Sequence, residues 1–225
     1  MIVVTGASKG LGKAIGLRLH SRGLDVLGIA RNPDSLPFPA IACDVTSYDT
    51  LRGIAQDLRK RNTPITGLVN AAGIASMNLA LTTPAHVTQA IVATNLLGTI
   101  YSCQAFAPLI IRNGGGSIVN FSTIAVAIGL MGESVYAASK AGVEGFTRVL
   151  ARELAGFGIT VNCVAPGPID TDLIQGIDQD KIDRIVHAQI IQKQFTPSDV
   201  CDVVELLLEP RSRSLSGQVM RIGGT

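Results

Sequence analysis

The sequence predicts an α/β fold in which one parallel sheet is covered by helices on both faces. Three observations point to this fold. Short apolar runs alternate with longer helical patterns, several of the runs are continuously apolar, and a glycine-rich turn joins the first run to the first helical pattern. Continuously apolar runs are typical of strands that are buried on both faces. Alternating strands and helices build such a sheet through right-handed crossovers.

The apolar runs predict seven strands, at Ile2–Thr5, Val26–Ala30, Ala40–Cys43, Leu68–Asn70, Ser117–Phe121, Thr160–Val164 and Val219–Ile222. The helical patterns cover Leu11–Leu19, Tyr48–Arg61, Pro84–Ile111, Ser134–Phe157, Asp178–Gln192 and Pro197–Leu208. Nine residues with three prolines join the second strand to the third, so we expect a loop there in place of a helix. The predicted arrangement is a doubly wound parallel sheet with the strand order 3-2-1-4-5-6-7.

The composition fits one folded domain over residues 1–225. Hydrophobic residues make up 47% of the chain and charged residues 16%, which excludes a disordered protein. A net charge of +2 without a run of Lys or Arg excludes a nucleic-acid partner. The four cysteines and three histidines show no metal-ligand spacing. We therefore expect no metal, no disulfide, and a cytoplasmic protein with reduced, buried cysteines.

One segment, Val87–Ile111, has no charged side chain and is long enough to cross a bilayer. It also contains threonine, glutamine, asparagine and serine side chains, which hydrocarbon would penalise. A helix buried between the sheet and a neighbour therefore fits better than a membrane span. The first apolar run leads directly into a glycine-rich turn, so no targeting segment is expected.

The glycine-rich turn T-G-A-S-K-G-L-G, from Thr5 to Gly12, follows the first strand and opens the first helix. Glycines there allow a tight turn and let the backbone approach a pyrophosphate at the helix N-terminus. Glycines also mark ordinary turns, but the position between strand and helix favours a dinucleotide site in a Rossmann-type domain. The residues expected to meet the cofactor are Gly6, Ser8, Lys9, Gly10, Leu11 and Gly12.

The end of the second strand indicates which dinucleotide is bound. NAD enzymes place an acidic residue about 20 positions after the glycine motif, whereas an arginine accommodates a 2′-phosphate. Here Arg31 stands 19 residues after Gly12, with Asn32 beside it, and Lys9 adds a second cation. These residues predict NADP(H) in preference to NAD.

Tyr136 and Lys140 in Y-A-A-S-K lie one helical turn apart, so both side chains are on one helix face. The pKa of a tyrosine in water is about 10, too high for efficient proton transfer near neutrality. A nearby ammonium lowers that pKa because it favours the phenolate. Such a pair alone is more often a solvated surface pair, and other motifs are needed to identify it as catalytic.

Those motifs run through the whole chain. Besides the two above, they are Asp44-Val45, Asn70-Ala71-Ala72-Gly73, Asn95, Pro166-Gly167-Pro168-Ile169-Asp170-Thr171 and the final G-Q-V-M-R-I-G-G. In these motifs and their order, the sequence from Ile2 to Gly224 resembles the short-chain dehydrogenase/reductase family, most closely its 3-oxoacyl-[acyl-carrier-protein] reductase type. The resemblance implies that Asp44 and Val45 contact adenine. It also implies that the segment from Asn70 to Gly73 supports the sheet and the nicotinamide ribose, and that Pro166, Gly167, Ile169 and Thr171 lie near the carboxamide.

The resemblance also implies the catalytic roles. Tyr136 would protonate the carbonyl oxygen, Lys140 would lower the tyrosine pKa and bind the nicotinamide ribose, and Asn95 would hold a relay water. In the family, a serine 13 residues before the tyrosine hydrogen-bonds the substrate oxygen. That position is Thr123 here, and Ser122 is its neighbour. Side chains of adjacent residues near a strand end point to opposite sides, so we assign the role to Thr123 by position and keep Ser122 as the alternative.

The predicted reaction is hydride transfer between NADP(H) and a carbonyl/alcohol pair, with a 3-oxoacyl thioester or similar ketone as the first candidate. The alternatives are a dehydrogenase of a small or sugar-like alcohol and an NADP(H)-binding regulator without turnover. The residues expected to border the substrate are apolar: Ile128, Leu130, Met131, Leu173 and Ile174. The helices at Pro84–Ile111 and Ser134–Phe157 match those that form the family's dimer interface, so we expect a homo-oligomer, either a dimer or a tetramer.

Overall fold

The computed structural model describes residues 1–33, 35–169 and 179–225. Within these residues, seven parallel strands form one sheet in the order β3-β2-β1-β4-β5-β6-β7, as the sequence predicts. The strands are β1 Ile2–Thr5, β2 Val26–Ala30, β3 Ala40–Ala42, β4 Gly67–Asn70, β5 Gly116–Phe121, β6 Ile159–Ala165 and β7 Val219–Arg221. The strand order changes direction between β1 and β4. The crevice at the carboxyl ends of these two strands is therefore where a ligand is expected.

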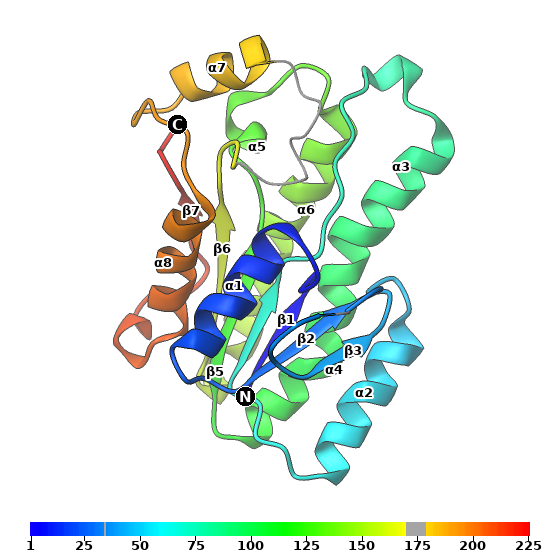
Figure 1. The fold of residues 1–225 in the computed structure, drawn as a ribbon, viewed down its shortest axis with the longest axis vertical. Coiled ribbons are helices and arrows are strands. Elements are labelled where there is room, and N and C mark those ends of the chain that lie inside the picture. The colour runs from blue at the N-terminus through cyan, green and yellow to red at the C-terminus, as the bar shows by residue number, and fades with distance from the viewer. Residues whose placement is uncertain (34, 170–178) are drawn as a thin grey trace.

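Helices cover both faces of this sheet (Figure 1). They are α1 Gly10–Ser21, α2 Tyr48–Lys60, α3 Ala85–Val92, α4 Gly98–Arg112, α5 Ala125–Ile128, α6 Ser134–Leu154, α7 Gln179–His187 and α8 Pro197–Leu208. On one face α1 packs against α8, and Ile15 and Val204 belong to the core beneath them. On the other face α2, α4 and α6 bury a second core that contains Leu51 and Phe106. The predicted doubly wound architecture is confirmed.

The connection between β2 and β3 contains no helix in its described residues, 31–33 and 35–39, as the prolines predict. Phe38 from this loop takes up the space that a helix would cover. Its ring is buried beside α1, and a Cβ on Gly16 would lie only 2.5 Å from it. Because Gly16 has no side chain, α1 can pack directly onto this loop.

The segment predicted as one helix over Pro84–Ile111 is divided by a π-helical turn at Ala93–Leu97, between α3 and α4. Together these elements form a helical stretch, Ala85–Arg112, that is long and apolar enough to cross a membrane by length and composition alone. Half of the most apolar part of this stretch is buried inside the protein. This burial fits a core helix, which is the alternative that the sequence favours. π-Helical turns are often found at functional sites, and this one contains the buried Asn95.

Two further elements differ from the sequence prediction. The short helix α5 follows β5 where no helix was expected, and α7 ends at His187 although its apolar pattern continues to Gln192. Both helices lie at the same end of the molecule (Figure 1), where Ala125 of α5 and Ile182 of α7 line a common cavity. These differences therefore concern the end of the fold where a substrate would enter.

Candidate active site

The glycine-rich turn between β1 and α1 is built for a close approach of backbone atoms. Gly6 has a φ of +69°, and a Cβ on it would lie 2.8 Å from the backbone nitrogen of Ala72. A Cβ on Gly12 would overlap the carbonyl oxygen of Gly6. The first N–H groups of α1 have no partner within the helix, and Gly10 and Leu11 face a large cavity. Such an arrangement places a helix N-terminus, which favours anions, at the switch point of the sheet.

That cavity has a volume of about 530 Å³, within the range of cofactor sites. Most of the predicted cofactor residues line it: Gly6, Ser8, Lys9, Gly10, Leu11, Arg31, Asn32, Asp44, Val45, Ala71, Ala72, Gly73, Tyr136, Lys140, Pro166, Gly167 and Ile169. Gly12 and Asn70 lie behind the cavity wall, Gly12 in the turn and Asn70 in the buried sheet. Thr171, together with Leu173 and Ile174, lies outside the described residues.

Two exposed cations border this cavity, Lys9 from the glycine-rich turn before α1 and Arg31 directly after β2. Neither forms a salt bridge with any other described residue. Asp44 lines the same region, and its Oδ1 accepts hydrogen bonds from the backbone nitrogen (2.9 Å) and the hydroxyl (2.8 Å) of Thr46. These hydrogen bonds, with a smaller contribution from Arg31, lower the pKa of Asp44, so the carboxylate is fixed in its charged form.

At the other end of the cavity, α6 presents Tyr136 and Lys140, and both side chains are buried. The ammonium of Lys140 donates a hydrogen bond to the carbonyl oxygen of Phe121 at 2.9 Å, and burial lowers its pKa to about 8. Burial raises the pKa of Tyr136, the charge of Glu133 raises it further, and a hydrogen bond with Thr123 lowers it. Lys140 is not among the groups that shift the pKa of Tyr136 in this structure, so the lowering expected from the sequence is not seen.

The two candidate hydroxyls after β5 point in different directions. Thr123 lines both the large cavity and a smaller cavity beside it, and its Oγ1 accepts a hydrogen bond from the backbone nitrogen of Ala125 at 3.2 Å. The hydroxyl of Ser122 instead donates to Oε1 of the buried Glu144 at 2.8 Å. Ser122 is therefore engaged with α6, whereas Thr123 lines both cavities together with Tyr136.

Asn95 in the π-helical turn holds the loop that follows β4. Its Oδ1 accepts from the backbone nitrogen of Ile74 at 2.8 Å, and its Nδ2 donates to the carbonyl oxygen of the same residue at 2.9 Å. The same Nδ2 lies 3.1 Å from the hydroxyl of Ser139, which donates to the carbonyl oxygen of Tyr136. Ser139, which the sequence analysis missed, thus connects Asn95 to the helix of Tyr136.

Gly73 brings Asn95 and Lys140 to the same point. A Cβ on Gly73 would lie 3.3 Å from Oδ1 of Asn95 and 3.5 Å from Nζ of Lys140. The structure therefore places all four predicted catalytic residues at the large cavity. Thr123, Tyr136 and Lys140 line it, and Asn95 lies just behind its wall beside Gly73. Nothing in the spacing of the sequence shows this proximity, because Gly73, Asn95 and Lys140 come from three separate elements.

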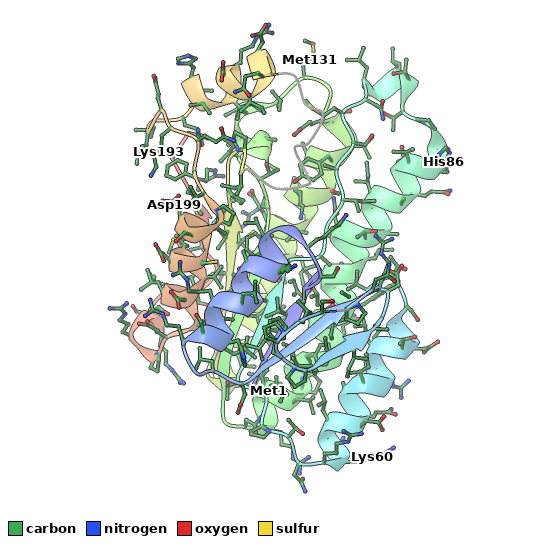
Figure 2. All side chains as sticks on the ribbon, in the orientation of Figure 1. Met1, Lys60, His86, Met131, Lys193 and Asp199 are labelled. Carbon is green, nitrogen blue, oxygen red and sulfur yellow. The ribbon has the colours of Figure 1, made fainter. Side chains whose placement is uncertain are left out.

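The smaller cavity, of about 120 Å³, adjoins the large one. Tyr136 and Thr123 line both cavities, and Leu130 lines the smaller one as predicted. Ile128 and Met131 do not line it, and Met131 is 79% exposed at the α7 end of the molecule (Figure 2). The lining residues that the sequence analysis missed include Met77, Glu133, Ile182 and Ile185. The two isoleucines are one helical turn apart on α7, a spacing that also occurs on ordinary core helices.

Known proteins resemble the chain over nearly its whole length. The model of a family described as enoyl-(acyl carrier protein) reductase matches residues 6–224. Carbonyl reductase family member 4 of Danio rerio is 33% identical, covering 100% of this chain and 96% of that protein. The 3-oxoacyl-[acyl-carrier-protein] reductase FabG of Staphylococcus epidermidis is 32% identical, covering 99% and 96%.

Solved structures agree with this resemblance. The ligand-free aldohexose dehydrogenase of Thermoplasma acidophilum superposes with a TM-score of 0.90 at 30% identity, covering 99% of this chain and 92% of that one. A short-chain type dehydrogenase/reductase from Mycobacterium ulcerans superposes with a TM-score of 0.91 at 25% identity, covering 98% and 87%.

Proposed function

This chain belongs to the short-chain dehydrogenase/reductase family, and we propose that it is an NADP(H)-dependent carbonyl reductase with Tyr136 as the proton donor. Proteins of this family are oxidoreductases that bind a nicotinamide cofactor and act on small molecules. One observation carries the proposal: Tyr136 and Thr123 line both the cofactor-sized cavity and the smaller cavity beside it. A carbonyl in the smaller cavity would meet both hydroxyls at its junction with the larger one.

The chemistry follows from these positions. Bound NADPH supplies a hydride to the carbonyl carbon. The Tyr136 hydroxyl gives its proton to the carbonyl oxygen, while the Thr123 hydroxyl donates a hydrogen bond to that oxygen. Burial raises the pKa of Tyr136, which keeps the proton on the phenol until the substrate oxygen takes it. Lys140, with a pKa of about 8, is still an ammonium at neutral pH and stabilises the phenolate left behind.

The preference for NADP(H) rests on Lys9 and Arg31. Both border the large cavity, and neither is paired with another described residue, so both are available to a 2′-phosphate. Charge-assisted hydrogen bonds to a phosphate are about twice as strong as neutral ones. Asn95, Gly73 and Lys140 would then support the nicotinamide ribose at the opposite end of the cavity.

Two substrate classes are candidates. The relatives named carbonyl reductase and 3-oxoacyl-[acyl-carrier-protein] reductase favour a ketone or a 3-oxoacyl thioester. The buried carboxyl group of Glu133 in the smaller cavity favours a hydroxylated carbonyl compound, and a similar solved structure is named an aldohexose dehydrogenase. Both classes are reduced by the same transfer of hydride and proton.

The proposal is tested by NADPH oxidation with a panel of small ketones, hydroxyketones, aldoses and 3-oxoacyl thioesters, each run with NADH in parallel. We expect turnover of at least one class, with NADPH as the better cofactor. Tight NADPH binding without turnover of any member would instead identify a cofactor-binding protein that has lost its enzymatic activity.

We also propose a homo-oligomer with two-fold symmetry. The outer face of α6 carries the exposed Ala138, Ala141 and Val149, while Leu97 and Pro108 are exposed along the neighbouring long helix. Arg148 and Arg152 are exposed beside the α6 residues, whereas the residues named on the long helix are uncharged, and small side chains allow helices to approach closely. Light scattering at micromolar concentration should give at least twice the monomer mass, and a monomer there would exclude this assembly.

A further inference from the structure

Glu133 places a carboxyl group in the wall of the smaller cavity, three residues before Tyr136. It is the N-cap residue of α6, but its side chain makes no capping hydrogen bond. Among the residues that the structure describes, the carboxyl group has no hydrogen-bond or ion-pair partner. The side chain is nevertheless buried, with 8% of its surface exposed. The residue is thus buried while its carboxyl oxygens open onto the cavity without a partner from the described residues, which leaves them free to meet a ligand there.

The charge state of this group sets what it can bind. Burial raises the pKa of Glu133, because a carboxylate loses hydration inside the protein. The position at the N-terminus of α6 acts in the opposite direction, since the helix dipole favours a negative charge there. An ionised carboxylate only accepts hydrogen bonds, so its missing partner must be a donor.

The cavity wall contains three hydroxyl groups, those of Ser76, Thr123 and Tyr136, but among the described residues none of them is hydrogen-bonded to Glu133. Of the described residues that line it, Glu133 and Tyr136 are the only ones with titratable side chains, and none is a cation. Most of the others are apolar, among them Met77, Leu130 and Ile182. The carboxylate is therefore available to a donor on a molecule that occupies the cavity.

We propose that Glu133 is a specificity-determining residue whose carboxylate accepts a hydrogen bond from a hydroxyl group that the substrate carries beside the reacting carbonyl. This inference rests on the proposed function, since it places that carbonyl at Tyr136 and Thr123. A substrate carboxylate or phosphate at this point would be repelled by Glu133. A cavity of about 120 Å³ is well below the size of drug-sized sites, so the hydroxylated end of the substrate is small.

The first test compares two ketones of the same shape, hydroxyacetone and 2-butanone, in which a hydroxyl replaces a methyl group. A hydrogen bond to a charged group should make kcat/KM for hydroxyacetone at least about tenfold higher in the unmutated protein. Pyruvate, which carries a carboxylate beside the carbonyl, should be the poorest of the three. Equal kcat/KM for hydroxyacetone and 2-butanone would overturn the inference.

Variants of Glu133 separate recognition from structure. Glu133→Met keeps the length of the side chain without the acceptor, and should bring the ratio of the two kcat/KM values to within about threefold of one. Glu133→Gln keeps an acceptor oxygen and should retain part of the preference. Glu153→Met changes an exposed glutamate of the same helix and should leave the ratio unchanged. A merely structural role would lower both kcat/KM values together and leave their ratio intact, which would contradict our inference.

A binding measurement keeps this test independent of turnover. Saturation-transfer NMR with the protein and NADP⁺ should show 1,2-propanediol bound more tightly than 2-butanol, and Glu133→Met should remove the difference. If neither ketone is reduced but the diol preference depends on Glu133, the proposed reaction fails and the recognition site stands. If the ketones are reduced without any effect of Glu133, the recognition site fails and the reaction stands.

Discussion

The two halves of the proposed site are built by different means. The cofactor half, at β1, α1 and β4, is shaped by backbone: Gly6 and Gly12 leave no room for a Cβ, and Gly73 lies against Asn95 and Lys140. The substrate half, at α5, α6 and α7, is shaped by the side chains of Thr123, Glu133 and Tyr136. A surface made of backbone atoms depends little on side-chain identity, so it suits a cofactor that many enzymes share. A surface made of side chains can be altered by single substitutions. The difference indicates that specificity for the substrate resides in the second half.

Tyr136→Phe should have the largest effect on the reaction in the substrate half. The change removes the proposed proton donor but keeps the ring and its packing against the cavity. General acid catalysis contributes typically 10²- to 10⁴-fold, so kcat should fall by about that factor. NADPH binding, measured by fluorescence titration, should be unchanged because the backbone of the cofactor half is untouched. Retention of more than about a tenth of kcat would show that another group is the acid.

Thr123→Val and Ser122→Ala should separate two neighbouring hydroxyls. Loss of the Thr123 donor should cost about 2–4 kcal/mol in transition-state stabilisation, measured as kcat/KM. Ser122→Ala should have a mild effect on kcat/KM but should lower the free energy of unfolding by about 1–3 kcal/mol, because Glu144 loses a buried donor. Thr123→Ser is the matched control and should keep activity. The reverse result, a crippled Ser122→Ala and a normal Thr123→Val, would transfer the role to Ser122.

Gly12→Ala tests the backbone half. The new Cβ would overlap the carbonyl oxygen of Gly6, so the turn has to move. Overpacking of this kind costs about 1–3 kcal/mol, and NADPH affinity should fall by about tenfold or more. Gly53→Ala is a suitable control, because a Cβ on this glycine of α2 meets nothing within 4 Å. An unchanged Kd for NADPH in Gly12→Ala would show that the turn is not shaped for the cofactor.

Arg31→Asp has the smallest expected effect and alters the cofactor half through a side chain. One or two cations on a 2′-phosphate should give at least about a tenfold preference for NADPH over NADH. The variant should lose most of that preference, since the new carboxylate repels the phosphate and accepts from a ribose hydroxyl. The measurement is kcat/KM with each cofactor. Equal values for the two cofactors in the unmutated protein would exclude the proposed preference.

The five inner strands β1, β2, β4, β5 and β6 could be predicted from the sequence because a strand buried on both faces leaves a continuous apolar run. The cofactor turn could be predicted because its glycines stand together in the chain. Glu133 and Ser139 could not, since an acid at a helix start and a serine within a helix are ordinary features of surface helices. Their roles depend on which elements the fold brings beside them, namely α7 for Glu133 and the π-helical turn for Ser139.

The π-helical turn at Ala93–Leu97 interrupts the α-helical periodicity of the long helix. A π turn holds about one more residue than an α turn, so the side-chain periodicity of α3 is shifted by one residue relative to that of α4. Deletion of one residue there would give a continuous α-helix in which α3 and α4 keep their relative orientation, because the wider turn had absorbed the extra residue. The widened turn would be lost, and with it the position from which Asn95 binds both backbone groups of Ile74. Single-residue deletions in this turn should therefore be tolerated far less than substitutions at its surface.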